Sequence, residues 1–275
     1  IPSIKKAMQR ALELHKGYPA NKAQLAGKRG GPVEFQFIDK QIPGAAKHHH
    51  CYHCHHVTEE VRRVKYQANR LSAADLWVYP LPENIGLKMD VDDGLRVKSV
   101  VPESPAARVG ILADDEVILM NGQRLISQAD IQWVLHKAPV ETQLTTVLRR
   151  AGQSLQKTIT LSGSWKETDL SWRETSWALR PGLQTVPLSP EQKQAGNVSA
   201  DALALRVKWI RSEAAYVKEA GLREGDLIVA VDGKTAAMNE SQFLAYVRLN
   251  HPSGETVRLT LRRGSQTEDV LLPVK

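Results

Sequence analysis

The residues best suited to chemistry form the run Cys51-Tyr52-His53-Cys54-His55, which contains both cysteines of this 275-residue chain. Two thiols separated by two residues can add to the two vinyl groups of one porphyrin, which makes this spacing the attachment signature of c-type haem. The imidazole of His55 directly follows the second thiol and is placed to bind the iron on its proximal side. The pattern therefore predicts one covalent haem c per chain, held by Cys51, Cys54 and His55.

Other chemistry is open to the same residues. Six of the nine histidines lie between positions 48 and 56, and histidine-rich tracts with cysteines also bind zinc or copper. A Cys-x-x-Cys pair can serve as a redox dithiol, but that function expects a βαβ context, and a plain disulfide is a further alternative. A zinc or copper site is the main competitor to haem.

The second axial ligand of a haem iron would decide between an electron carrier and an open haem. We expect bis-histidine ligation, with the distal ligand drawn from His48, His49 or His50, because these residues closely precede the motif and can fold over the ring. The remaining candidates are His15, Met8, His53, His56, Met89 and His136.

Composition limits the function and the compartment. The formal net charge is +7, but the basic residues are dispersed, so we expect no nucleic-acid partner. A basic surface can still steer an acidic redox partner. No stretch approaches the roughly 18 apolar residues of a membrane helix, and we expect no membrane span. Because haem c is assembled outside the cytoplasmic membrane, the motif predicts a periplasmic or extracellular protein.

A repeat at domain scale occupies the rest of the chain. Residues 97–122 and 207–233 share a β-branched strand, a short helix ending at glycine, a second strand and a hairpin turn. Each copy continues into a helix, at 127–136 and 239–248, and closes with a hairpin whose turn is rich in arginine. The matched pairs are Gly110 with Gly221, Asp115 with Asp226, and Asn121-Gly122 with Asp232-Gly233.

These copies resemble the bacterial PDZ domain of the HtrA type. The resemblance rests on Ser104-Pro105-Ala106-Ala107, on Val109-Gly110-Ile111 and on Gly225-Asp226-Leu227-Ile228. Asp114 departs from it, because the family usually has glycine there. With the run at 75–84, the chain also resembles planctomycete secreted thioredoxin-like/PDZ proteins. The fold class implied is α+β: a short helical haem-binding segment (1–75), then PDZ domains at 76–165 and 166–275, each a small, partly open antiparallel β-barrel with two helices.

The PDZ resemblance implies binding of a protein's C-terminal peptide, which adds a strand to a sheet edge while loop amides hold its carboxylate. In the first copy the matching loop is Asn84, Ile85, Gly86 and Leu87, and the groove helix contributes residues near Ser127, Ile131 and Leu135. In the second copy the loop is expected near 177–179. Pro181 would then lie in the receiving strand and weaken binding, because proline has no N–H.

Two helices are expected in the segment before the repeats. Ser3 is a candidate cap for a helix over 4–16, residues 17–47 read as loop, and Thr58 is a candidate cap for a helix over 59–70. The paired acids Asp92-Asp93 and Asp114-Asp115 sit at expected turns, and we interpret them as facing solvent.

We expect no enzyme, because the chain has no Gly-x-Ser-x-Gly elbow, P-loop or His-Glu-x-x-His motif. The sequence favours an extracytoplasmic monohaem c-type cytochrome fused to tandem PDZ domains, which transfers electrons or senses redox state while docked to a protein partner. The alternative is a non-enzymatic PDZ adaptor with a zinc or copper site. Homo-oligomers through PDZ contacts are a further expectation.

Overall fold

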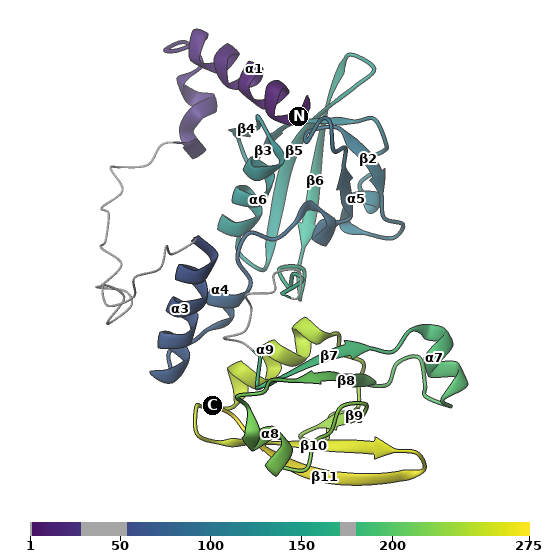
Figure 1. Ribbon diagram of the computed structural model, residues 1–275. Helices are drawn as coiled ribbons and strands as arrows, with labels where there is room; N and C mark the ends of the chain where they lie inside the picture. The colour runs from purple at the N-terminus through teal and green to yellow at the C-terminus, as the bar shows by residue number, and fades with distance from the viewer. Residues whose placement is uncertain (1, 29–53, 171–179) are drawn as a thin grey trace. The chain divides into compact units, whose positions relative to one another are not determined.

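The computed structural model describes residues 2–28, 54–170 and 180–275 (Figure 1). They form two compact units, each built around one repeat. The first unit contains residues 2–28 and 77–168. The second contains residues 54–76, 169–170 and 180–275.

The first unit contains two small antiparallel sheets, with strand orders β1-β2 and β4-β3-β5-β6. Its core is formed by apolar side chains such as Leu87, Val97 and Leu144, all fully buried. Its elements are α1 (Pro2–Lys16), η1 (Lys22–Lys28), η3 (Pro82–Ile85), β1 (Leu87–Met89), β2 (Val97–Val100), α5 (Pro105–Arg108), β3 (Glu116–Met120), β4 (Gln123–Arg124), α6 (Gln128–Lys137), β5 (Thr142–Arg150) and β6 (Gln153–Leu161).

The second unit has one antiparallel sheet in the order β11-β10-β9-β8-β7, so β7 is an edge strand. Phe243 and Val257 lie in its core. Its elements are α3 (Cys54–Gln67), α4 (Ala73–Leu76), β7 (Leu183–Pro187), α7 (Pro190–Ala195), β8 (Leu205–Ile210), α8 (Ala215–Glu219), β9 (Leu227–Val231), α9 (Glu240–Asn250), β10 (Thr256–Arg263) and β11 (Gln266–Pro273).

The two copies repeat the expected order of elements. In each, a strand, a short helix, a second strand, a long helix and a hairpin follow one another. The turns at Asn121-Gly122 and Asp232-Gly233 have positive φ at both residues, which is the backbone of a type I′ hairpin turn. The α+β class is therefore confirmed for the repeats.

One ion pair occurs at the same place in both repeats. Arg150, at the end of β5, donates from Nε and Nη2 to the two carboxylate oxygens of Asp115 at 2.6 and 2.7 Å, and from Nη2 to the carbonyl of Gly110 at 2.8 Å. Arg263 makes the same three contacts to Asp226 (2.7 and 2.7 Å) and Gly221 (2.6 Å). We call this arrangement the Asp–Arg clamp.

The structure corrects our interpretation of two of the four paired acids. Asp115 is fully buried and Asp93 is 6% exposed, so neither faces solvent. Burial alone would raise the pKa of Asp115, but hydrogen bonds from Arg150 and from the Leu112 N–H hold it below its ordinary value. Asp114, in contrast, is exposed as expected, with 83% of its side chain accessible.

Helix α1 lies against the first repeat (Figure 1). Arg10 joins Asp93 at 2.8 Å and Glu116 at 3.1 Å, and Lys6 reaches Asp93 at 3.3 Å. The opposite face of the helix is apolar and exposed. It carries Ile4, Met8 and Leu12, of which 54%, 68% and 52% are accessible.

Helix α3 packs into the core of the second repeat. Tyr66 is 4% exposed, and its hydroxyl donates to the carbonyl of His251 at 2.9 Å. The guanidinium of Arg248 lies 4.4 Å from the centre of the Tyr66 ring. Arg62 bonds the carbonyl of Asp75 at 3.0 Å and thereby ties α3 to α4.

Residues 1–75, expected to form one haem-binding segment, thus contribute helices to two different units. Two helix starts also differ from the predictions. Helix α1 begins at Pro2 and α3 at Cys54, so Ser3 and Thr58 lie inside helices rather than at their caps. Residues 17–21 of the expected loop form a turn, and the 3-10 helix η1 that follows lies against β4. The remaining residues of that loop, 29–47, are outside the described residues.

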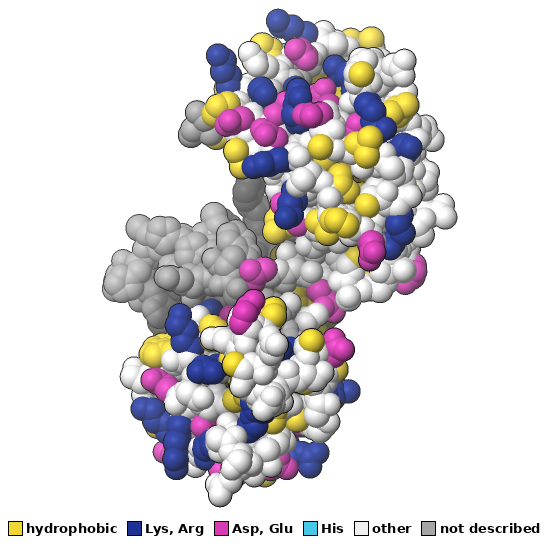
Figure 2. Space-filling view, turned by 90° about the vertical axis from the view of Figure 1, so that its right-hand side faces the viewer, with side chains coloured by type: hydrophobic (Ala, Val, Ile, Leu, Met, Phe, Trp, Pro, Cys, Tyr) yellow, Lys and Arg dark blue, Asp and Glu magenta, His cyan; other side chains and the backbone are white. Residues whose placement is uncertain are grey.

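Within the described ranges, no helix is both long and apolar enough to cross a bilayer. On the face shown in Figure 2, basic and acidic side chains are interspersed rather than gathered into one basic surface.

The Asp–Arg clamp yields a stability prediction. Asp115→Asn and Asp226→Asn should each destabilise their own repeat by about 2–3 kcal/mol. Each change removes the charged partner of the clamp's arginine at a buried site. Asp114→Asn is the matched control and should change stability by less than about 0.5 kcal/mol, since its ion pair is exposed. Urea unfolding gives the size of the loss, and hydrogen exchange of β3 and β9 shows which repeat loses protection. Equal stabilities of the Asp114→Asn and Asp115→Asn proteins would contradict the role of the clamp.

Candidate peptide grooves and cofactor motif

The loop expected to receive a peptide carboxylate in the first repeat follows helix η3. Gly86 ends this helix in a left-handed conformation, with φ of 92°, and its N–H donates to the Glu83 carbonyl at 2.9 Å. A Cβ at this position would overlap the side chain of Ser104, the N-cap of α5. Only glycine fits here, so Gly86 determines the path of the chain into β1.

The four predicted loop residues have distinct surroundings. Ile85, Gly86 and Leu87 are buried, while Asn84 is half-buried. The amide nitrogen of Asn84 donates to the carbonyls of Trp165 and Glu167 at 2.9 and 2.8 Å. Asn84 therefore anchors the segment that follows β6.

Helix α6 is oriented differently from our expectation. Ile131 and Leu135 are fully buried in the core, and Ser127 is the N-cap, paired with Asp130 in a capping box. Trp133 instead faces outward, with Tyr79 6.4 Å away between ring centroids. The sequence analysis did not predict this exposed aromatic pair, although Tyr79 belongs to the run at 75–84 that carries a family resemblance.

His136 and Met89, both candidate iron ligands, belong to the first repeat. The His136 ring lies 4.5 Å from that of Tyr79, and burial, with Lys137 and Lys166 nearby, lowers its pKa. Met89 is 7% exposed and lies in the core. Met8 and His15 are instead on the exposed side of α1.

The loop of the second repeat lies at residues 180–183, later in the chain than the predicted 177–179. The Arg211 N–H donates to the Gly182 carbonyl at 3.0 Å, as the Val101 N–H does to that of Gly86 at 2.9 Å. Residues 180–183 thus correspond to Asn84–Leu87, and Pro181 precedes β7 instead of lying in it. The expected positions 177–179 are outside the described residues. Pro181 occupies the place of Ile85, so the loop, rather than the strand, lacks an N–H.

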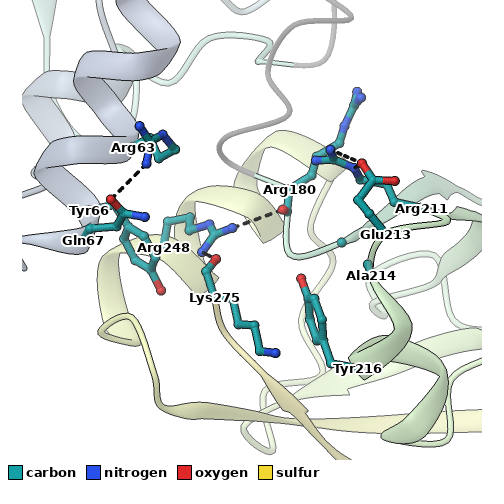
Figure 3. Close-up of a pocket in the computed structure, with 11 residues that line it drawn as sticks. Arg63, Tyr66, Gln67, Arg180, Arg211, Glu213, Ala214, Tyr216, Arg248 and Lys275 are labelled. Carbon is teal, nitrogen blue, oxygen red and sulfur yellow. Dashed lines mark hydrogen bonds and ion pairs between the residues drawn. The ribbon is translucent and has the colours of Figure 1, made fainter. Parts of the chain in front are cut away.

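A pocket of about 180 Å³ opens beside this loop (Figure 3). It lies among the loop, the end of α9, the start of α8 and helix α3. Five of its lining side chains are basic and one is acidic. The basic ones are Arg63, Arg180, Arg211, Arg248 and Lys275; Glu213 is the acid, and Tyr66, Gln67, Gly182, Ala214 and Tyr216 complete the lining.

Arg248 is the most buried of these cations, with 4% of the residue exposed. It donates to the carbonyls of Lys275 and Arg180 at 2.8 and 3.0 Å, so it joins the chain's last described residue to the loop. Burial lowers its pKa, while the neighbouring tyrosines Tyr66 and Tyr216 act in the other direction.

The edge of β7 already contacts a carboxylate. Glu240, the first residue of α9, is 8% exposed and accepts a hydrogen bond from the Thr185 N–H. Arg180 lies 3.7 Å from its Oε1. Burial raises the pKa of Glu240, against the opposing effects of Arg180 and the Thr185 N–H.

The structure describes the last two residues of the cofactor motif, which begin α3. These two residues are Cys54 and His55. Cys51, His53 and the candidate distal ligands His48, His49 and His50 lie outside the described residues. Among the described side chains, no group of three or more His, Cys, Asp or Glu forms a metal site.

Comparison with known proteins identifies the repeats. A PDZ domain family matches residues 84–161, and a second PDZ domain family matches residues 218–263. The chain is 27% identical over 191 residues to the periplasmic serine endoprotease DegP of Escherichia coli (strain K12), covering 68% of this chain and 35% of DegP. It is 26% identical over 146 residues to the periplasmic pH-dependent serine endoprotease DegQ of the same strain, covering 52% of this chain and 29% of DegQ.

A solved structure with local similarity is the HtrA3 PDZ domain bound to a phage-derived ligand. It is 21% identical, and the match covers 34% of this chain and 80% of that one, with a TM-score of 0.27. The chain spans about a third of the length of the curated relatives. It contains two regions that match PDZ domain families, and it is similar to the DegP and DegQ proteins.

Gly86 provides a test of the loop geometry. Gly86→Ala should destabilise the first PDZ domain by about 2–4 kcal/mol, because alanine must adopt positive φ and also displace Ser104. Gly152→Ala is the control, since Gly152 has φ of 81° but nothing within 4 Å of a Cβ. It should cost about 1 kcal/mol. Thermal unfolding of both variants measures the difference, and equal losses would show that the contact with Ser104 is unimportant.

Proposed function

We propose that this chain is a non-enzymatic, extracytoplasmic protein that docks on a partner through its PDZ domains and carries a covalent haem c for electron transfer or redox sensing. The observation that carries the proposal is that Cys54 and His55, the last two residues of the motif, begin α3, a helix that packs into the second PDZ domain. One chain would thus unite a redox group with protein-binding modules.

Peptide docking is proposed first for the first PDZ domain. A peptide would add to the edge of β1, and its carboxylate would lie at the Asn84–Leu87 loop. The close fit of Gly86 to Ser104 supports this, because it holds the loop in one conformation before any ligand binds. The partner is a protein with an accessible C-terminus.

The donor set of the motif fits haem c. Cys51 and Cys54 would form the thioethers, and His55 would be the proximal iron ligand. His48, His49 or His50 would supply the distal ligand. When bound, the haem supplies one-electron transfer at the iron. Helix α3 would hold the attachment point rigidly, because Tyr66 and Arg62 fix the helix to its unit.

Two observations support a proposal for the compartment of this protein. Haem c attachment takes place outside the cytoplasmic membrane, and the relatives DegP and DegQ are described as periplasmic. We therefore propose a periplasmic or extracellular location, a redox protein as partner, and self-association as an option for the PDZ domains.

A zinc or copper site on the same residues is the second candidate. It is favoured by the density of histidines around the two cysteines, six between positions 48 and 56. In that case the protein would be a PDZ adaptor without redox function.

Haem attachment has a direct test. The protein, produced with a cytochrome c maturation system, should give a haem-stained band on a denaturing gel, since thioethers survive denaturation. Cys51→Ala with Cys54→Ala should abolish the stain, whereas His136→Ala should leave it unchanged. A colourless band, together with stoichiometric zinc or copper by elemental analysis, would contradict haem attachment and support the zinc or copper site.

Peptide docking is tested by fluorescence anisotropy with labelled peptides that end in a hydrophobic residue. A free C-terminus should bind about 10-fold or more tightly than its amidated form, because a charged hydrogen bond to the loop is lost. Gly86→Ala should weaken binding, and Gly152→Ala should not. Equal affinity for free and amidated peptides would exclude C-terminal recognition.

A further inference from the structure

The two PDZ domains differ in charge where a ligand's C-terminus would lie. Arg180 stands two residues before Gly182, where the first domain has Asn84 before Gly86. Counted from the helix N-caps Asn239 and Ser127, Arg248 corresponds to His136. At both positions the second domain has an arginine, which is a permanent cation. The first domain has a side chain that is neutral at pH 7, because burial lowers the pKa of His136.

Helix α3 adds to this positive charge. Arg63 and Tyr66 project from it toward the pocket, opposite the loop (Figure 3). Arg63 pairs with Glu60 on its own helix at 2.6 Å and keeps 37% of its side chain exposed. Arg211, on the far side, pairs with Glu213 at 2.7 Å. The lining therefore offers a ligand many N–H donors beside its apolar surface.

An acidic side chain that does not line the pocket already lies beside Arg180. The Glu240 carboxylate accepts the Thr185 N–H of the edge strand and lies 3.7 Å from Arg180. Arg180, which lines the pocket, therefore already lies beside one carboxylate. Guanidinium groups bind carboxylates through two parallel hydrogen bonds, and they can replace the loop N–H that Pro181 lacks.

We propose that the second PDZ domain binds peptides with an acidic C-terminal residue, whose two carboxylates lie in the pocket of Arg63, Arg180, Arg211 and Arg248. This rests on the proposed function only in assuming that the domains bind peptide C-termini. It assigns the two domains different partners: the first takes a neutral terminus, and the second an acidic one. It also makes α3, which begins at the cofactor motif, one wall of the second binding site.

The test uses the full chain and short labelled peptides identical except for their last residue, Glu, Gln or Leu. The Glu peptide should bind about 10-fold more tightly than the Gln peptide, because each charged hydrogen bond adds to affinity. Arg180→Asn, which installs the residue of the first domain, and Arg63→Gln should each reduce this preference at least about 3-fold. Arg206→Gln, an exposed arginine of β8 outside the pocket, is the matched control and should preserve it.

The outcomes separate the acidic specificity of the second domain from peptide docking in general. A Glu preference that falls in the Arg180 and Arg63 variants, with unchanged melting temperatures, supports the proposal. Equal binding of Glu and Gln peptides, or a preference that persists when both arginines are replaced, overturns it. If the Leu peptide still binds in either of those cases, peptide docking survives and only the acidic specificity fails; if no free C-terminus binds, the proposed docking function fails as well.

Discussion

The Asp–Arg clamp is the interaction on which both repeats depend. The carbonyl of Asp115 accepts the Val97 N–H, and the Asp114 N–H donates to the Val97 carbonyl, each at 2.8 Å. Because Asp115 also pairs with Arg150 on β5, it links β2, the start of β3 and β5 at one point. The short helix α5 begins just before this junction, and its cap Ser104 sets the space beside Gly86. Helix α5 thus runs from Ser104, which lies against the peptide loop, toward Gly110, whose carbonyl the clamp binds.

On this common frame the two domains diverge at few positions. The first has a neutral groove end, an exposed aromatic pair at Tyr79 and Trp133, and Asn84 bound to the following segment. The second has arginines at the loop and at the end of its long helix. Because the clamp holds the backbone alike in both, side-chain charge at these positions can change ligand preference without a change of fold.

Helix α3 connects the two chemistries within the second unit. Its first residues belong to the cysteine motif, and Arg63, Tyr66 and Gln67 at its other end line the pocket. Tyr66 and Arg248 share one stacked contact, so the helix and the end of the groove form a single packed structure. A cofactor held at Cys54 and His55 would be rigidly attached to a ligand-binding domain.

The amino-acid sequence by itself determined the repeat, the hairpin turns at Asn121-Gly122 and Asp232-Gly233, and the loop at Gly86, because these depend on local backbone preferences and spacing. It also located the cysteine motif, whose cofactor stays a prediction. It misjudged Asp93 and Asp115, whose burial depends on Arg10 and Arg150 from distant parts of the chain. Only the tertiary structure decided that α1 and α3 pack on different repeats, and that arginines from α3, the loop and α9 meet in one pocket, since such charges converge through long-range packing that no local pattern encodes.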